Sequence, residues 1–225
     1  MENMISLRVH GRRAMFTDPI MKVGGEKSSY PIPTYESLKG ILDSVYWKPT
    51  FTWIVDKVRI MNPIRNEPVS ARTIAYSGSN DLSIYSYLVD VDYEIQARFE
   101  WNLQNEKMAD DRNENKHFFS AQRMIKRGGR FDVFLGTREC AAYVEECEFG
   151  SRAGAYDTSD FEFGMMFHGF DYPSQTGKDI LVARFWRPKM VKGVIDFIRP
   201  EECEARKDLR AMKFVPRPIS KGEVV

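Results

Sequence analysis

Lys116 and His117 are adjacent in the sequence and place a permanent cation beside a side chain that titrates near neutrality. Such a pair suits cleavage of a phosphodiester. Histidine can move a proton on or off the attacking hydroxyl or the leaving oxygen, while lysine offsets the charge of the transition state. The plainer interpretation is that His117, followed by Phe118 and Phe119, packs at the boundary of a helix. The pair alone leaves both interpretations open.

The run Lys126-Arg127-Gly128-Gly129-Arg130 is a second feature that suits a phosphate. Glycine has no side chain in the way, so the backbone N–H groups of this turn could approach an anion closely, with cations on both sides. A Gly-Gly pair after a helical run is also an ordinary helix end with solvated charges around it. The run therefore indicates a phosphate-binding turn only in the company of other signals.

Aromatic residues surround Lys48, namely Tyr46, Trp47, Phe51 and Trp53. Aromatic rings beside a cation can stack unpaired bases next to a phosphate contact. The alternative is packing in the core, which we favour for Trp53. For Tyr46, which precedes a loop marked by Pro49, both interpretations remain open.

Charge is distributed unevenly, although 33 Lys and Arg nearly balance 32 Asp and Glu and the formal net charge is only +1. The segment 113–130 is basic, with Lys116, Arg123, Lys126, Arg127 and Arg130 against the single acid Glu114. The segment 139–162 is acidic, with Glu139, Glu145, Glu146, Glu148, Asp157, Asp160 and Glu162 against Arg152. Phosphates would be attracted to the first segment and repelled by the second, which predicts that any nucleic acid binds on one side.

Several other kinds of site lack a sequence signal. His10 lies in a predicted strand and His168 follows an apolar run, so we expect both to be structural. No HExxH, paired-His or Asp-cluster spacing is present, and neither is a P-loop, GxSxG or Rossmann glycine pattern. We therefore expect no metal centre and no other cofactor.

The cysteines and the hydropathy pattern predict a cellular compartment. Cys140, Cys147 and Cys203 are odd in number and form no CxxC pair, which argues against a disulfide framework or a zinc knuckle. The first twenty residues lack the apolar core of a secretory signal, and no later stretch is apolar enough to span a bilayer. We expect a soluble cytoplasmic protein with no membrane partner.

The elements that position these residues can be predicted from periodicity. Residues 89–101 alternate between apolar and polar side chains, as do residues 5–10, and both are predicted strands with one buried face. Residues 51–61 are rich in β-branched and aromatic side chains and are a third strand. Apolar residues recur at helical spacing over 35–45, so Tyr46 sits at a helix end.

A second helix is predicted from 113 to 127, ended by Gly128 and Gly129, and strand-like composition follows over 133–148. The order strand, helix, strand, strand, helix, strand predicts an α+β chain with a ferredoxin-like N-terminal domain, the architecture of RNA-recognition domains. We assign this domain to residues 1–149. Short strand candidates near 165–170, 181–186 and 194–198 predict a small antiparallel β extension over 150–225.

Several stretches together resemble the Cas-five proteins of subtype I-C (Dvulg type) CRISPR systems, members of the repeat-associated RNA-binding (RAMP) superfamily. The most specific is 128–140, Gly-Gly-Arg-Phe-Asp-Val-Phe-Leu-Gly-Thr-Arg-Glu-Cys. The others are residues 35–42, 46–49, 113–119, 184–188 and 193–195, so the likeness spans nearly the whole chain.

The resemblance implies a metal-independent endoribonuclease that cuts precursor CRISPR RNA within the repeat, near the base of its hairpin, to give mature guide RNA. The family's catalytic trio, a tyrosine ending the first helix and an adjacent lysine and histidine on the second, matches Tyr46, Lys116 and His117. We expect the 2′-hydroxyl of the RNA to attack the phosphate, with His117 exchanging protons and Lys116 stabilising charge. Tyr46 is expected to position the RNA, because a phenol with a pKa of about 10 is a poor base.

The resemblance also implies partners. The product stays bound by its 5′ handle within a surveillance complex that contains other Cas subunits. The candidate RNA-binding residues are Lys48, Arg123, Lys126, Arg127, Gly128, Gly129 and Arg130. The alternative function is a non-catalytic RNA-binding subunit that caps the 5′ handle, the role of Cas-five proteins where a separate processing nuclease exists. Double-stranded DNA is a further partner compatible with either function.

Overall fold

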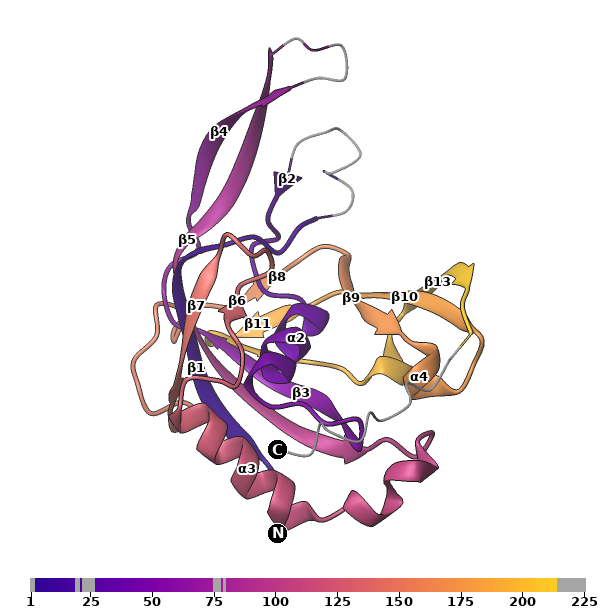
Figure 1. Cartoon of the computed structure of the whole chain (residues 1–225). Coiled ribbons are helices and arrows are strands. Elements are labelled where there is room, and N and C mark those ends of the chain that lie inside the picture. The colour runs from indigo at the N-terminus through magenta and orange to yellow at the C-terminus, as the bar shows by residue number, and fades with distance from the viewer. Residues whose placement is uncertain (1–2, 19–20, 22–26, 75–77, 79, 214–225) are drawn as a thin grey trace.

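The computed structural model describes residues 3–18, 21, 27–74, 78 and 80–213. At the centre of its main sheet, four strands lie in the order β7-β1-β5-β3, each antiparallel to its neighbour. These strands are β1 (Ile5–Ala14), β3 (Phe51–Ile60), β5 (Asn80–Trp101) and β7 (Ala141–Glu146). Helix α2 (Tyr35–Val45) connects β1 to β3, and α3 (Glu114–Lys126) lies between β5 and β7 (Figure 1). This topology confirms the predicted ferredoxin-like fold.

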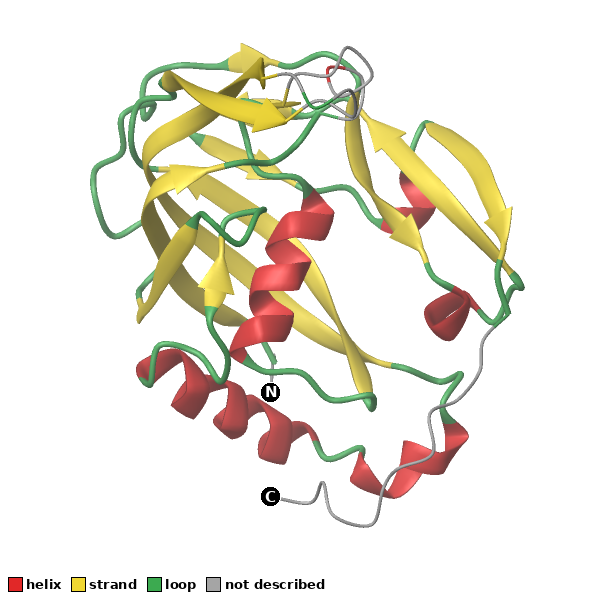
Figure 2. Ribbon diagram, turned by 45° about the horizontal axis from the view of Figure 1, so that its top comes forward, coloured by secondary structure: helices red, strands yellow, loops and turns green. Residues whose placement is uncertain are grey.

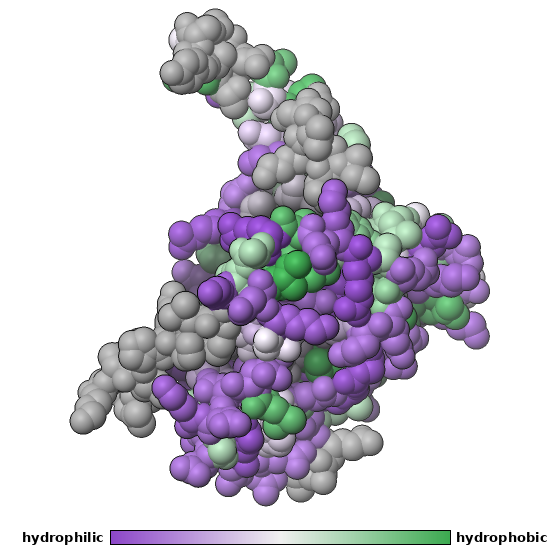
Figure 3. Space-filling view, turned by 90° about the vertical axis from the view of Figure 1, so that its right-hand side faces the viewer, coloured by the Kyte–Doolittle hydropathy of each residue, from purple (hydrophilic) through white to green (hydrophobic). Residues whose placement is uncertain are grey.

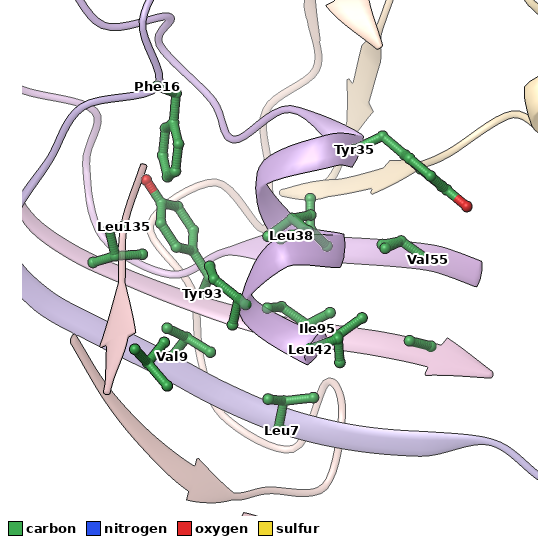
Figure 4. Close-up of a cluster of buried hydrophobic side chains, with 14 of the residues drawn as sticks. Leu7, Val9, Phe16, Tyr35, Leu38, Leu42, Val55, Tyr93, Ile95 and Leu135 are labelled. Atoms are coloured by element: carbon green, nitrogen blue, oxygen red, sulfur yellow. The ribbon is translucent and has the colours of Figure 1, made fainter. Parts of the chain in front are cut away.

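Alternating side chains of β1 and β5 form the buried face of this sheet. Leu7 lies opposite Ile95 in the antiparallel register, and both side chains are buried. Figure 4 shows them in one apolar cluster with Leu38 and Leu42 of α2. Burial of each such side chain contributes roughly 1.5–3 kcal/mol, so α2 is held on the sheet by its apolar stripe.

Both helices begin at a side-chain cap. The Thr34 hydroxyl accepts a hydrogen bond from the Ser37 backbone N–H at 3.2 Å at the start of α2. Asn113 Oδ1 accepts one from the Lys116 N–H at 3.0 Å at the start of α3. Each cap satisfies one of the backbone donors that a helix start leaves free. The predicted helix starts are confirmed to within a residue.

Strand β5 is longer than predicted, because its first half forms a protruding hairpin with β4 (Asn66–Ile74) (Figure 1). The short strand β2 (Lys27–Ser28) pairs in parallel with the same half of β5. The hairpin segment of β5 carries several Asn, Asp and Ser residues, which hide its alternation in the sequence.

The strand-like segment 133–148 supplies the last strand of the ferredoxin-like order, β7, and one further short strand. The segment contains two strands, β6 (Val133–Phe134) and β7, which pair antiparallel to each other. Gly136 lies between them with φ of +93°, and a Cβ there would lie 1.9 Å from the Met15 carbonyl oxygen. The chain reverses at a point where only glycine fits, and this ends the first strand.

The C-terminal part contributes to two sheets. Three short strands extend the main sheet beyond β3, namely β12 (Val194–Asp196), β11 (Lys189–Val191) and β8 (Phe161–Glu162). A separate antiparallel sheet contains β9 (Met166–Asp171), β10 (Ile180–Trp186) and β13 (Ala205–Ala211), with the short turns α4 (Pro173–Thr176) and η2 (Pro200–Glu202) beside it.

This second sheet confirms the predicted β extension (Figure 2). The strand candidate at 194–198 belongs to the main sheet instead, because Ile195 pairs with Val58 of β3. The division of the chain into domains at residues 149 and 150 stays a prediction.

No helix in the described part of the chain is both long and apolar enough to cross a membrane. Seen from the side of the small sheet, the surface is mostly hydrophilic with separate apolar patches (Figure 3).

Candidate active site

The C-terminal end of α2 lies close to α3, as Figure 2 shows, and this brings together residues 71 positions apart. Tyr46 is the C-cap residue that directly follows α2, and its N–H donates to the Leu42 carbonyl at 2.9 Å. Its own carbonyl accepts a hydrogen bond from Trp53 Nε1 at 2.8 Å, which fixes the chain as it enters β3. Trp53 is fully buried, as predicted.

Helix α3 turns its two candidate catalytic residues to different surroundings. Neighbouring helix positions point about 100° apart, so residues 116 and 117 cannot share a face. His117 is 0% exposed and faces the sheet, whereas 57% of the Lys116 side chain is exposed. The sequence therefore supplies an inner imidazole and an outer ammonium group.

The side chains of Tyr46 and His117 meet directly. Tyr46 Oη lies 2.9 Å from His117 Nδ1, and the other ring nitrogen, Nε2, lies 2.8 Å from the Asp111 backbone oxygen. A carbonyl oxygen can only accept, so in the neutral ring Nε2 carries the proton. Nδ1 then has a free lone pair and accepts a hydrogen bond from the Tyr46 hydroxyl.

The imidazole is enclosed by aromatic rings. The ring centroids of Phe51, Trp101 and Phe99 lie 5.3, 5.8 and 6.2 Å from that of His117. Tyr46 itself is buried, with 5% of its surface exposed. A proton can therefore leave the ring only through the Tyr46 hydroxyl or on the side that Asp111 covers.

Asp111 ends a 3-10 turn, η1 (Glu106–Asp111), and its carboxylate contacts three residues of the site. One oxygen, Oδ1, pairs with Lys116 Nζ. The other, Oδ2, accepts a hydrogen bond from Thr50 Oγ1 at 2.6 Å and lies 3.4 Å from His117 Nε2. Asp111 and Thr50 were not predicted as site residues, because only the path of η1 brings Asp111 next to Thr50 and His117.

These contacts and burial shift the pKa values of Asp111, Lys116 and Tyr46. Burial opposes ionisation of Asp111, but the hydrogen bonds from Lys116 and Thr50 outweigh it and lower the pKa of the carboxyl. The same hydrogen bond to Asp111 raises the pKa of the Lys116 ammonium group. Burial raises the pKa of the Tyr46 phenol. At neutral pH the site therefore holds a carboxylate, a cation and a neutral phenol.

The glycine turn beside the site does not offer free N–H groups to a phosphate. The N–H groups of Gly128 and Gly129 donate to carbonyls of α3 at 2.9 and 2.8 Å, and those of Arg130 and Phe131 donate to carbonyls of α2 at 3.1 Å. Gly128 and Gly129 have φ of +87° and +109°. The turn thus ends α3 and ties it to the end of α2, next to Tyr46, which is the ordinary helix end that the sequence left open. Contact of Gly128 and Gly129 with RNA stays a prediction.

The candidate RNA-binding cations lie around this turn. Arg123, Lys126, Arg127 and Arg130 are exposed, and Lys48 is half-buried. Exposed aromatic side chains lie in the same segments, with Trp47 50% and Phe131 62% exposed. Of the aromatic residues that the sequence proposed for stacking, Trp47 is exposed, whereas Phe51 belongs to the core.

The remaining histidines lie elsewhere. His168 is buried and stacks on Tyr35 with ring centroids 4.3 Å apart, as expected for a structural residue. His10 lies on β1, with Nε2 3.4 Å from a carboxylate oxygen of Glu145. Among the described residues, no three His, Cys, Asp or Glu side chains are grouped as metal ligands would be.

Comparison with known proteins relates the chain to one family. The family model described as CRISPR-associated protein (Cas_Cas5) matches residues 4–198. A relative from Mannheimia succiniciproducens, named CRISPR pre-crRNA endoribonuclease Cas5d, is 28% identical over 224 residues, which cover 87% of this chain and 95% of the relative. A relative of the same name from Thermus thermophilus is 30% identical over 149 residues, 62% of each chain. A solved structure described as a CRISPR-associated protein is 36% identical with a TM-score of 0.78, and the match covers 92% of this chain and 97% of that one.

Proposed function

The chain belongs to the Cas5 (Cas-five) family of CRISPR-associated proteins, subtype I-C, and from this premise we propose that it is an endoribonuclease acting on precursor CRISPR RNA. It cuts within the repeat near the base of the hairpin and so produces mature guide RNA. Two relatives carry the name of this activity. The observation that carries the proposal for this chain is the contact of 2.9 Å between Tyr46 Oη and His117 Nδ1, beside the exposed ammonium group of Lys116.

The proposed reaction is attack by the 2′-hydroxyl of the RNA on the neighbouring phosphate. A bond forms between O2′ and phosphorus, the bond from phosphorus to O5′ breaks, and the departing 5′-oxygen takes a proton from water. A 2′,3′-cyclic phosphate and a 5′-hydroxyl result. This reaction needs a proton acceptor and a cation, and protein groups can supply both without a metal ion.

Tyr46 acts as the proton relay in this proposal. Since His117 has no exposed surface and contacts the phenol, the 2′-hydroxyl transfers its proton to Tyr46 Oη while Tyr46 transfers its own to His117 Nδ1. The phenol stays neutral throughout, which agrees with its raised pKa. Lys116 then stabilises the negative charge that collects on the phosphate oxygens.

The exposed cations of α3 and its glycine turn hold the RNA backbone. Within the described residues, Arg123, Arg127 and Arg130 form no ion pair, so they remain free to attract phosphates. After cleavage the protein stays on the 5′ handle as a subunit beside other Cas proteins in the cytoplasm. Binding of double-stranded DNA by the same surface stays a prediction.

The test is cleavage of the cognate repeat RNA by the purified chain in the presence of a chelator. We expect the wild type to cut, and His117→Ala and Lys116→Ala to lose about 10²–10⁴-fold in rate, the usual size of an acid–base contribution. Lys107→Ala is the matched control, because Lys107 is exposed on η1 and should leave the rate unchanged. Normal cutting by both site variants would refute the assignment.

The second candidate is a non-catalytic subunit that binds the 5′ handle. The complete burial of His117, with both ring nitrogens already bonded, is the observation that favours it. The two functions differ in one outcome. Tight binding of the repeat RNA without any cleavage, at every salt concentration and pH tested, would establish the second.

A further inference from the structure

Asp111 presents all three of its oxygen atoms to the residues proposed for catalysis and to their neighbour Thr50. Its backbone oxygen lies 2.8 Å from His117 Nε2, Oδ1 pairs with Lys116, and Oδ2 accepts from Thr50 at 2.6 Å. Side chains at the ends of surface turns usually point into solvent. This one is directed inward, which calls for a physical explanation.

We propose that Asp111 is a positioning residue for RNA cleavage, with Thr50 as the residue that holds it. The inference rests on the proposed function. The backbone carbonyl of Asp111 sets the tautomer of His117, and its carboxylate stabilises the imidazolium that forms when the ring accepts a proton. Asp111 therefore acts through His117 and does not touch the RNA.

The tautomer of His117 determines whether Tyr46 can transfer its proton to the ring. With the proton on Nε2, His117 presents a lone pair at Nδ1 and can accept the proton of Tyr46. With the proton on Nδ1, the ring would donate to the phenol oxygen, and Tyr46 could pass no proton inward. The hydrogen bond from Nε2 to the Asp111 carbonyl selects the first arrangement.

The carboxylate of Asp111 meets the second requirement of the proton relay, which is stabilisation of the positive charge on protonated His117. A proton taken from Tyr46 makes a cation in a ring that is 0% exposed and packed among Phe51, Phe99 and Trp101. A buried cation is strongly unfavourable unless an anion is near. Asp111 Oδ2, at 3.4 Å from Nε2, is the carboxylate in ion-pair range of this ring within the described part of the chain.

The surroundings fix Asp111 in this place. Thr50 is fully buried, and its carbonyl accepts a hydrogen bond from the Asn102 N–H at 2.9 Å. Arg112, the next residue after Asp111, donates to the carbonyls of Asn102 and Asn105 at 3.2 and 3.3 Å. The start of β3, the end of β5 and η1 are thus joined on both sides of the carboxylate, which is the arrangement that a positioning residue requires.

The experiment compares kcat and KM for the cognate repeat RNA in chelator. The variants are Asp111→Asn, Asp111→Ala, Thr50→Val and Thr50→Ser, with Asp110→Asn as the control on the exposed neighbouring residue. We expect Asp111→Ala and Asp111→Asn to lower kcat about 10- to 100-fold, below the roughly 10²–10⁴-fold of a whole acid–base function, with little change in KM. Thr50→Val should share this loss and Thr50→Ser should recover most of it.

A spectroscopic measurement separates positioning from a merely structural role. The chain has three histidines, so ¹⁵N shifts of labelled histidine can be assigned with a His117→Ala spectrum. In the wild type we expect a protonated Nε2 and an unprotonated Nδ1 for His117. Asp111→Ala keeps the backbone carbonyl but loses the carboxylate contacts with Thr50 and Lys116 that hold this carbonyl against Nε2, so the single tautomer should give way to a mixture. If an Asp111 variant fails to fold, the Thr50→Val and Thr50→Ser pair carries the same test.

The outcomes are distinguishable. Wild-type kcat in Asp111→Ala and Thr50→Val, while His117→Ala stays inactive, would overturn the inference and leave the proposed function standing. A faster rate in the Asp111 variants would also overturn it, because Asp111 would then block the site. A wild type that does not cut, or a His117→Ala variant that cuts normally, would refute the proposed function itself.

Discussion

At the scale of residues, the site is defined by a histidine without direct access to solvent. His117 is enclosed by aromatic rings and bonded at both nitrogens, so its neighbours decide what it can do. Tyr46 contacts its Nδ1, and Asp111 links it to Lys116. The acid and base properties of the site are therefore set jointly by four residues, His117, Tyr46, Asp111 and Lys116.

The ionisation of Asp111 predicts a dependence of stability on pH. Its pKa is lower in the folded chain than the usual 3.8, so its ion pair stabilises the protein above that value. This contribution is lost as the pH falls through the lowered pKa. We expect the difference in the free energy of unfolding between wild type and Asp111→Asn to be present at pH 7 and to shrink below about pH 4. Urea denaturation at a series of pH values measures it, and a difference that is unchanged at pH 3 would contradict the assignment.

The residues of the site were predictable to different degrees. Tyr46, Lys116 and His117 could be proposed because they carry a family resemblance, although their roles still await the tests above. Asp111 could not, because an aspartate five positions before a lysine is common and only the η1 turn directs it inward. Nor could the sequence show that the Tyr46 phenol contacts Nδ1 of a fully buried His117.

At the scale of elements, the glycine turn after α3 connects the two helices that carry the site. Arg130 and Phe131 donate their backbone N–H groups to the carbonyls of Val45 and Ser44, directly before Tyr46. These carbonyls would otherwise lack partners at the end of α2. The turn therefore fixes how the end of α2 lies against α3.

Gly129→Ala tests this connection. Gly129 has φ of +109°, and an added Cβ would lie 3.1 Å from the Phe131 carbonyl oxygen, so we expect a loss of about 1–2 kcal/mol or more in stability. Because the turn holds the end of α2, the cleavage rate should fall as well. Gly40→Ala is the matched control. Gly40 lies exposed within α2 with open space around it, and alanine there should add about 0.5–1 kcal/mol without changing cleavage.

Urea denaturation and single-turnover cleavage measure both variants. A Gly129→Ala protein as stable and as active as the wild type would show that the turn does not position Tyr46.

The elements were predictable where their signal is local. Both helices begin at caps that are visible in the sequence, Thr34 and Asn113, and the alternation over 89–101 belongs to β5. The hairpin of β4 and β5, the split between β6 and β7 and the place of β12 were missed or misplaced. Each of these depends on which distant strand a segment pairs with, and alternation alone does not specify a partner.

At the scale of the whole molecule, the charged side chains of the described residues are paired on one face of the main sheet and largely unpaired on α3 and its glycine turn at the other face. On the face away from the core, Arg8 and Arg152 pair with Asp92, while Arg59 and Arg152 pair with Glu94. The predicted strand over 89–101 was expected to bury one face only, yet Asp92 and Glu94 of the other face are buried in this network. Its arginines are neutralised.

The exposed cations of α3 and its glycine turn, in contrast, are mostly not paired with acidic side chains in the described part of the chain. Among the described residues, Arg123, Arg127 and Arg130 have no acidic partner in ion-pair range, and Lys126 pairs with Glu146 at 3.5 Å. Binding of these residues to an RNA backbone would release counterions from the RNA, whereas binding on the other face would have to break existing ion pairs. This supports the prediction from the sequence that a nucleic acid binds on one side, next to Lys116.

The most direct test of the account is the chemistry of the RNA ends. The purified chain is incubated with its cognate repeat RNA in chelator, and the masses of both fragments are determined. Attack by the 2′-hydroxyl predicts a 2′,3′-cyclic phosphate on the upstream fragment and a 5′-hydroxyl on the downstream one. A 3′-hydroxyl with a 5′-phosphate would mean that water was the nucleophile, and the proposed use of Tyr46, Lys116 and His117 would be wrong.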